Sequence, residues 1–498
     1  MKITISNPTC AFIDSTDEEL VRLRKELTFT NTSIVHDIKR LYNNHWARNK
    51  DKEKWMANIE TLKRKAKRIL VFGENQPHIY PGSIPYLTGF NLEIDNKIVY
   101  PTPKKVAWKK PLPFELYPYQ EESWGKLLEV KHGNVELCTG SGKSAILLKL
   151  CRETGFRTAI VAPSKSIFNE LLEKFEYHFG KGMVGTFGAG KKKLDKKFTI
   201  CIGDSLVNIV RDTEEWKFFS NLDMLLADES HTFGAETLEE MCFGVLAAIP
   251  YRFFFSGTQT RGDGAEKLLQ AIIGQTVHTL TTQQAVEGGY ICPHEYRIVN
   301  VESSNPNYYT QDALDMKRKH FLKNRNICAF IAKFANAQSD RGLQTLILVE
   351  ELEQIAMLLP LLRAPTVIAH SEKKAERLSE LGLSKVDPAE SVEKFNKAQA
   401  LNLIGTSCIA TGTNIFANHF TFNWVGGSSE IKTLQGTVGR SVRLYKHNPW
   451  KDKCIPKEKC VIFDFNVYDV DIMVRHLENR IAYYNRSGSE IKHIKLTK

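Results

Sequence analysis

Short apolar runs alternate with amphipathic stretches over residues 117–282, and each run is rich in β-branched or aromatic residues. The runs that have the pattern of strands are 133–137, 157–162, 198–202, 222–227 and 251–256. A second series follows at 344–349, 365–369, 401–405, 422–425 and 459–463. Strands that alternate with helices form βαβ units, whose parallel sheets are covered by helices on both faces. The pattern therefore predicts an α/β fold with two tandem domains.

The regions before and after these two series have a different pattern. Residues 17–27 and 54–70 show helical periodicity, and closely spaced prolines at 101–113 are typical of a linker. We expect a small basic α+β domain at 1–112, α/β domains at 113–285 and 286–470, and a basic helical tail at 471–498.

The basic surplus of the chain is concentrated near its N-terminus. The whole chain has 68 Lys and Arg against 57 Asp and Glu, whereas residues 1–113 have 20 against 12. A local cationic excess is the pattern expected of a protein that binds a phosphate backbone. A solvated surface would explain the same charge equally well, so the charge alone leaves both interpretations open.

Composition excludes several other classes. The proportions differ from those of collagen, low-complexity disorder and disulfide-stapled miniproteins. No apolar run is long enough to span a bilayer, and the N-terminus lacks the pattern of a signal peptide. None of the ten cysteines forms a C-x-x-C pair, so we expect reduced thiols and no structural metal. These features predict a soluble, cytoplasmic protein without a membrane partner.

A glycine-rich segment, Cys138-Thr139-Gly140-Ser141-Gly142-Lys143-Ser144, directly follows the predicted strand 133–137. Glycines let backbone N–H groups approach phosphate without an obstructing Cβ atom, and a helix N-terminus favours anions. We expect Lys143 to reach the β- and γ-phosphates and the Ser144 hydroxyl to bind Mg²⁺. The segment predicts an ATP site that includes Thr139, Gly140, Ser141, Gly142, Lys143 and Ser144.

The predicted strand 222–227 ends in two adjacent carboxylates, Asp228 and Glu229, which are followed by His231. The carboxyl ends of parallel strands meet at one edge of a sheet, so we expect these acids to lie beside the glycine-rich loop. Asp228 would hold Mg²⁺ together with Ser144, and Glu229 would orient the attacking water. His231 is expected to sense the nucleotide and to couple this segment to the next one.

A third segment, Gln435-Gly436-Thr437-Val438-Gly439-Arg440-Ser441-Val442-Arg443, lies in the second α/β series. Arginines three positions apart share a helix face, and a guanidinium can bind a γ-phosphate. We predict that Arg440 and Arg443 act as arginine fingers on an ATP held by the first α/β domain, and that Gln435 couples the two events.

In this order, the three segments resemble the motifs of superfamily 2 helicases and translocases, over about residues 113–470. The resemblance implies two RecA-like domains and further functional residues. It implies adenine contacts by Gln120 and Tyr117, coupling by Ser256 and Thr258, and a nucleotide contact at Gly412. It also implies weaker nucleic-acid contacts by Pro163, Ser164, Lys165, Thr406 and Ser407. Asn414 replaces the acid that is usual near Gly412 in this family.

Residues 287–293 and 475–484 narrow the resemblance to XPB-like and phage UvsW-type helicases. That resemblance implies an ATP- and Mg²⁺-dependent enzyme that unwinds or branch-migrates forks, Holliday junctions and D-loops in phage recombination, repair and replication. Its expected partner is branched or forked DNA, and it would act as a monomer in the host bacterial cytoplasm.

Three alternatives stay open. The same motifs occur in RNA helicases and in duplex-DNA translocases that do not separate strands, and a nucleotide-switched DNA-binding module could also contain them. The lysines at 191–193 and the basic residues at 317–319 are either solvated faces or part of a nucleic-acid track.

Overall fold

A computed structural model of the chain describes residues 1–42, 45–104, 106, 108, 111–112, 114–230, 233, 235–257, 266–409, 415–427, 437–486 and 489–495. Internal contacts divide the chain into two units. The first contains Met1–Leu137 and Lys143–Thr279, and the second contains Cys138–Gly142 and Leu280–Lys498. Within the described residues, no helix is both long and apolar enough to cross a membrane.

The N-terminal region is built on a five-stranded sheet with the order β5-β6-β2-β1-β7. Its strands are β1 (Lys2–Asn7), β2 (Cys10–Asp14), β5 (Val71–Phe72), β6 (His78–Ile79) and β7 (Glu93–Asn96). α1 (Asp17–Glu26) packs beside this sheet and begins with a capping box between Thr16 and Glu19. The predicted α+β character of the N-terminal region agrees with this mixture of helices and strands.

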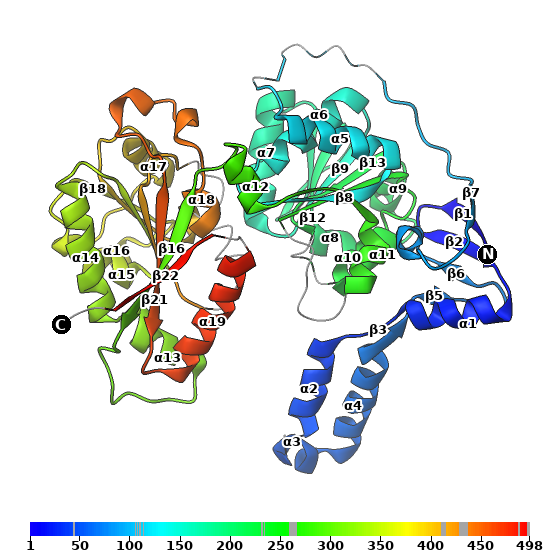
Figure 1. The fold of residues 1–498 in the computed structure, drawn as a ribbon, viewed down its shortest axis with the longest axis horizontal. Helices are drawn as coiled ribbons and strands as arrows, with labels where there is room; N and C mark the ends of the chain where they lie inside the picture. The colour runs from blue at the N-terminus through cyan, green and yellow to red at the C-terminus, as the bar shows by residue number, and fades with distance from the viewer. Residues whose placement is uncertain are drawn as a thin grey trace. The chain divides into compact units, whose positions relative to one another are not determined.

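A helical hairpin extends from this sheet (Figure 1). It consists of α2 (Thr32–Tyr42), α3 (His45–Lys50) and α4 (Lys52–Ala66), and it starts and ends at the antiparallel strands β3 (Thr28–Thr30) and β4 (Lys67–Ile69). The helix predicted over 54–70 is therefore wrong at its C-terminal end. Lys67 adopts extended φ and ψ angles, because residues 67–69 pair with β3 instead of continuing the helix.

The first α/β sheet has eight strands in the order β11-β10-β12-β9-β13-β14-β8-β15. The strands are β8 (His132–Leu137), β9 (Thr158–Ala162), β10 (Val184–Gly188), β11 (Lys191–Lys193), β12 (Phe198–Ile202), β13 (Met224–Ala227), β14 (Tyr251–Ser256) and β15 (Gln275–Leu280). The helices are α5 (Pro118–Val130), α6 (Lys143–Thr154), α7 (Lys165–Phe179), α8 (Gly203–Val207), α9 (Glu214–Ser220), α10 (Ala235–Phe243) and α11 (Glu266–Ile273), with η1 (Pro81–Tyr86) from the N-terminal region. All neighbours from β10 through β12, β9, β13 and β14 to β8 are parallel.

The second unit contains a seven-stranded sheet with the order β18-β19-β17-β20-β21-β16-β22, in which every pair is parallel. Its strands are β16 (His294–Val301), β17 (Thr345–Val349), β18 (Thr366–Ala369), β19 (Asn402–Gly405), β20 (Phe420–Trp424), β21 (Cys460–Val467) and β22 (Ile491–Lys495). Its α-helices are α12 (Thr282–Glu287), α13 (Ala313–Lys317), α14 (Arg325–Ser339), α15 (Leu352–Leu358), α16 (Ala375–Glu380), α17 (Pro388–Asn396), α18 (Gly439–Ser441) and α19 (Asp471–Arg486). Shorter turns are η3 (Arg318–Leu322), η4 (Leu359–Leu361), η5 (Ser407–Ile409), η7 (Tyr445–His447) and η8 (Lys451–Lys453).

The central strands of both sheets are buried on both faces. Every residue of β9, β13 and β14 is buried in the first sheet, and every residue of β17 and β19 is buried in the second. A strand that is buried on both faces appears in the sequence as a continuous apolar run, so it can be predicted from the sequence. All ten predicted strands are present. The predicted fold class, two tandem RecA-like sheets after an α+β region, is confirmed.

The predicted helical tail is helical only in α19. Its last part forms β22, which pairs with β16 and adds an edge strand to the second sheet. All ten cysteines are free thiols, as expected. The boundaries expected at 112, 285 and 470 stay predictions.

Candidate nucleotide site

Four neighbouring parallel strands of the first sheet, β9, β13, β14 and β8, all end at one edge. Each is followed by one of the segments that the sequence singles out: Pro163–Lys165, Asp228–His231, Ser256–Thr258 and Thr139–Ser144. The carboxyl edge of a parallel sheet is where α/β proteins bind their ligands. The topology thus brings the sequence-predicted residues of the first domain to one edge.

The glycine-rich loop has the backbone conformation that its glycines permit. Gly140 and Gly142 have φ angles of +88° and +83°, which side chains with a Cβ atom rarely adopt. The Ser141 hydroxyl donates to the Cys138 carbonyl at 2.7 Å and tightens the turn. Lys143 is buried at the start of α6, where its Nζ donates to the Leu137 carbonyl at 3.2 Å.

Lys143 also pairs with one of the two predicted catalytic carboxylates. Its Nζ lies 3.2 Å from Glu229 Oε1, and both side chains are nearly buried. Glu229 has a φ angle of +48°, an uncommon conformation for a residue other than glycine, and its N–H donates to Asp228 Oδ1 at 3.0 Å. Backbone strain of this kind is frequent at functional sites because the surrounding structure must enforce it.

Asp228 is buried beside this pair. Its burial, and after it the neighbouring Glu229 carboxylate, raise the pKa of Asp228 to about 7, whereas Lys143 and Lys174 oppose the rise. Two carboxylates in a dry site repel each other unless a cation lies between or beside them. A divalent cation would supply that charge, so the pair fits the expected role of Asp228 in binding Mg²⁺.

The predicted Mg²⁺ ligand Ser144 has a partner that the sequence analysis did not identify. Lys174 Nζ donates to Ser144 Oγ at 3.0 Å and to Glu170 Oε1 at 2.6 Å. Lys174 lies on α7 and has no motif of its own, so only the fold brings it to the loop. A basic side chain therefore contacts the hydroxyl where a metal ion is expected. The Ser144 hydroxyl and the Asp228 carboxylate are oxygen ligands of the kind that Mg²⁺ binds. Within the described part of the chain, no group of three or more His, Cys, Asp or Glu could hold a metal ion.

The segments after β13 and β14 are in direct contact. The Ser230 hydroxyl is buried and donates to the Phe255 carbonyl at 3.3 Å, next to Ser256, which is also buried. This bond connects the residue after Glu229 to the strand end that carries Ser256. His231 and Thr258, the other two residues expected to couple these segments, lie outside the described residues.

The residues expected to contact adenine lie at the start of α5. Gln120 is buried, and its Oε1 accepts from the Tyr117 N–H at 2.9 Å, which caps the helix. The Tyr117 ring lies nearly parallel to the Tyr119 ring, with centroids 5.9 Å apart. Their contact with adenine stays a prediction.

The expected nucleic-acid contacts of the first domain lie at the N-terminus of α7. Ser164 caps this helix by accepting from the Ile167 N–H at 3.4 Å, while Pro163 precedes it and Lys165 is exposed. The backbone N–H groups at a helix N-terminus favour anions, so this end of α7, with the positive charge of Lys165, is a favourable site for a phosphate.

The predicted arginine fingers belong to the second unit. Arg440 lies on α18 and is 5% exposed, and Arg443 follows shortly after it. The short helix is held by Ser441, whose hydroxyl donates to the Thr437 carbonyl at 2.8 Å and accepts from the Thr421 hydroxyl at 2.8 Å. Lys457 Nζ donates to the Ser441 carbonyl at 3.1 Å. Lys457 is a buried cation that the sequence analysis did not identify.

Thr406 and Ser407 follow β19, and Ser407 is exposed there at the carboxyl edge of the second sheet. Gly412 and Gln435 lie outside the described residues. The structure therefore brings Lys143, Asp228 and Glu229 together, and it describes only part of the set predicted for the second domain.

Comparisons with known proteins show what this chain is similar to. Residues 113–261 match the family model described as type III restriction enzyme, res subunit. The DNA 3′-5′ translocase XPB2 of Sulfurisphaera tokodaii is 26% identical over 298 residues, which are 59% of this chain and 63% of that protein. The chain thus spans less than two thirds of this relative.

Two solved structures resemble the fold. The DNA-bound type ISP restriction-modification enzyme LlaBIII matches with a TM-score of 0.53 and 11% identity, over 83% of this chain and 34% of that one. Bacteriophage T4 UvsW matches with a TM-score of 0.43 and 13% identity, over 100% of this chain and 99% of that one.

Residues 113–261 thus resemble the res subunit of type III restriction enzymes, and the chain resembles an XPB translocase. These similarities agree with the resemblance to superfamily 2 helicases and translocases that the sequence motifs indicate.

Proposed function

We propose that the chain is an ATP-driven motor that remodels branched or forked DNA. The observation that supports this most directly is the buried Lys143–Glu229 pair beside Asp228, at the edge where four motif-bearing strands end. A structural ion pair needs one carboxylate, whereas the second carboxylate, Asp228, is available as a ligand for a metal ion that assists hydrolysis.

Each residue of the site has a distinct role in the proposed reaction. Bound Mg²⁺–ATP would supply the phosphoryl group that is transferred to water. Ser144 and Asp228 would hold the metal ion, and the loop N–H groups from Thr139 to Ser144 would hold the phosphates. Glu229 would orient the water and accept its proton at a carboxylate oxygen.

The Lys143–Glu229 pair would make phosphate binding precede the activation of water in this reaction. While Lys143 pairs with Glu229, the carboxylate already has a cationic partner and is a poor acceptor for water. Phosphates are stronger anionic partners for the lysine, so their arrival would draw Nζ away from the carboxylate. Arg440 and Arg443 would then add positive charge to the transition state, which makes turnover depend on both α/β domains.

The basic helical hairpin supports DNA as the substrate. Its exposed, described side chains include the basic residues Lys39, Arg48, Lys50, Lys52, Lys54 and Lys63 against the acidic residues Asp37, Asp51, Glu53 and Glu60. A cationic excess on a protruding element suits a phosphate backbone, which dominates nucleic-acid affinity. We propose that this hairpin contacts the duplex near a junction, in the recombination and repair setting that the UvsW-type motifs imply.

Steady-state ATPase activity with a matched oligonucleotide panel tests the proposal. The panel holds length and salt constant and compares single strand, blunt duplex, fork, Holliday junction and single-stranded RNA. The strongest stimulation should come from a fork or junction. Stimulation by RNA alone would make the protein an RNA helicase. A single-turnover rate far above the steady-state rate would indicate a nucleotide-switched binding module instead of a motor.

A second function, duplex-DNA translocation without strand separation, is favoured by the similarity to a protein named as a DNA translocase. Displacement of a triplex-forming strand from blunt duplex, without unwinding of a forked substrate, would support this alternative. Unwinding of the fork would support the first proposal.

A further inference from the structure

The base of the helical hairpin is anchored on the first α/β domain. β3 and β4, which lead into and out of the hairpin, pair with Phe29 opposite Arg68. The Phe29 side chain is buried in a core that continues through the N-terminal sheet into α10 and α11. The hairpin and the α/β domain therefore share one hydrophobic core at the base of the hairpin.

On the side of β4, the anchor is a buried carboxylate of α10. Arg68 forms a bidentate pair with Glu239, with both N–O distances at 2.7 Å. The Tyr80 hydroxyl donates to Glu239 Oε1 at 2.8 Å, and the Tyr80 ring stacks on Phe243 of the same helix with centroids 3.8 Å apart. The Glu239 side chain is 14% exposed, and its hydrogen bonds raise the pKa of Arg68. Bidentate pairs of this kind fix orientation as well as distance.

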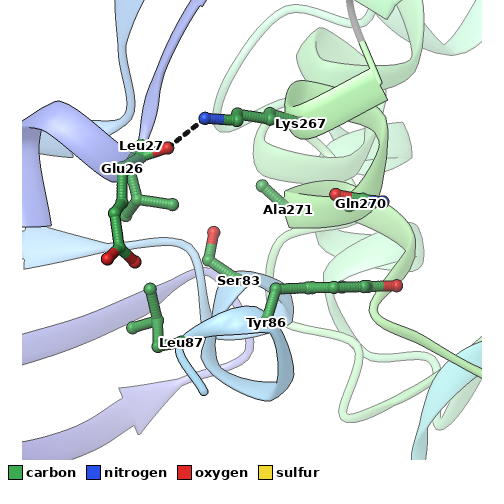
Figure 2. A pocket seen from close by; sticks show the side chains of 8 residues that line it. All are labelled: Glu26, Leu27, Ser83, Tyr86, Leu87, Lys267, Gln270 and Ala271. Carbon is green, nitrogen blue, oxygen red and sulfur yellow. Dashed lines mark hydrogen bonds between the residues drawn. The ribbon is translucent and has the colours of Figure 1, made fainter. Parts of the chain in front are cut away.

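On the side of β3, the anchor is Lys267 of α11. Its Nζ donates to the carbonyls of Glu26 and Thr28, the residues at the end of α1 and the start of β3. Figure 2 shows Lys267 reaching across a cavity of about 250 Å³ toward the Glu26 carbonyl. η1 closes the other side of this cavity, where the Tyr86 hydroxyl donates to the Gly274 carbonyl at 2.9 Å.

η1 also packs unusually closely against α11. A Cβ atom at Gly82 would collide with the Ala271 carbonyl, so only glycine allows this approach. The contact area therefore combines charge pairs, ring stacking and close backbone packing, which are the features of a fixed interface between domains and not of a loose linker.

The two anchored helices follow two segments of the ATP site along the chain. α10 begins at Ala235, shortly after Asp228 and Glu229, and α11 is the helix that follows Ser256. A shift of these segments during turnover that reaches α10 and α11 would also move the two strands at the base of the hairpin. Packed elements of this kind move as units because close-packed interfaces do not deform continuously.

We propose that Glu239 is a positioning residue that couples nucleic-acid contact at the hairpin to ATP turnover. This inference rests on the proposed function, because it requires that nucleic acid stimulates the ATPase. Glu239 acts through Arg68 and Tyr80 and contacts neither nucleotide nor nucleic acid. When the charge of Glu239 is removed, the hairpin stays folded and binds its substrate, but this binding no longer stimulates ATP hydrolysis.

The test uses Glu239→Gln in the full chain, with Glu240→Gln as the matched control, because Glu240 is an exposed neighbour on the same helix. The substrate is the fork from the ATPase panel. Four quantities are measured: ATPase without DNA, maximal ATPase with DNA, the DNA concentration for half-maximal stimulation, and the melting temperature. In Glu239→Gln, the ATPase rate without DNA and the DNA concentration for half-maximal stimulation should match the wild type. The stimulation of the ATPase by DNA should decrease roughly 5-fold or more, which is a typical coupling factor between two sites. Glu240→Gln should resemble the wild type.

A charge exchange, Arg68→Glu with Glu239→Arg, should recover at least half of the stimulation, because it restores the pair in reverse. If Glu239→Gln does not fold, Tyr80→Phe removes one hydrogen bond from the same carboxylate and should give a partial loss of stimulation. Full stimulation in Glu239→Gln, or a loss that is explained entirely by weaker DNA binding, would overturn the inference while leaving the proposed function intact. A wild-type ATPase that no nucleic acid stimulates would overturn the proposed function itself, and the inference with it.

Discussion

The two parallel sheets have closely similar topology, yet two of their strand ends differ in charge. In the first sheet, β8 ends in a glycine-rich loop that presents N–H groups and Lys143. In the second sheet, β17, which has the position that β9 has in the first sheet, is followed by Glu350 and Glu351. Glu350 pairs with Lys317, and Glu351 pairs with Arg318.

This difference shows how one fold can perform two tasks. The two carboxylates and their two cationic partners balance in charge, so the end of β17 has no net positive charge that would favour a phosphate. What the second sheet contributes to the proposed reaction is Arg440 and Arg443. The chemistry thus depends on the loops at the strand ends and not on the sheet itself.

The largest expected effect comes from removing the second sheet's contribution. Arg440→Ala should lower the DNA-stimulated ATPase rate by roughly 10³-fold or more, because an arginine finger stabilises charge that develops only in the transition state. ATP binding, measured with a fluorescent ATP analogue, should change little. Arg341→Ala, at an exposed arginine of the same unit, is the control. A rate within twofold of the wild type would mean that the first sheet works alone.

The buried charges of the second sheet should affect stability and not catalysis. Arg480 of α19 and Asp464 of β21 are each 1% exposed and form two bonds of 2.7 and 3.0 Å, and the Tyr484 hydroxyl donates to the same carboxylate at 2.8 Å. Arg480→Ala leaves an unpaired buried carboxylate and should lower the free energy of unfolding by about 3–5 kcal/mol. Urea unfolding measures the loss, with the exposed Arg475→Ala as the control. Equal stability of the two variants would contradict the assignment.

The two sheets should respond alike to acid, because each has a buried histidine at the start of a strand. Burial lowers the pKa of His132 on β8 and of His294 on β16 to about 4. Between pH 6.5 and 4 the unfolded chain binds the proton and the folded chain does not, so stability falls as the pH decreases through this window. Each histidine should account for a loss on the order of 3 kcal/mol.

Urea unfolding at pH 7, 6 and 5 checks this expectation. His132→Gln keeps a donor for the Ile272 carbonyl, 2.8 Å away, and should make the unfolding free energy less dependent on pH. Identical pH dependence in the variant and the wild type would show that His132 does not contribute to acid sensitivity.

The smallest expected effect lies at the carboxylates that follow β17. Glu350→Gln weakens a partly exposed pair with Lys317 and should reduce the free energy of unfolding by less than about 1 kcal/mol. The ATPase rate should stay within twofold of the wild type. A large loss of ATPase activity would mean that this strand end takes part in catalysis after all.

Sequence alone predicted the features that depend on local pattern. Buried central strands are continuous apolar runs, and the glycine-rich loop and the Asp228–Glu229 pair are each contiguous in the chain, so each of these features can be predicted without knowledge of the fold. Residues whose role depends on contacts with distant parts of the chain could not be predicted. Lys174 and Glu239 lie on ordinary amphipathic helices, and only the fold brings them to Ser144 and to Arg68. The end of α4 and the strand β22 were missed for the same reason, since their partners are far away in sequence.

The most direct test of the account is ATP turnover and ATP binding by Glu229→Gln. Glu229 is proposed to accept the proton from water, so the variant should lose roughly 10²–10⁴-fold in the DNA-stimulated rate. Because Glu229 pairs with Lys143 in the structure, removing its charge should leave ATP binding as tight as in the wild type or tighter. Turnover within a few fold of the wild type, or loss of ATP binding, would contradict the proposed site.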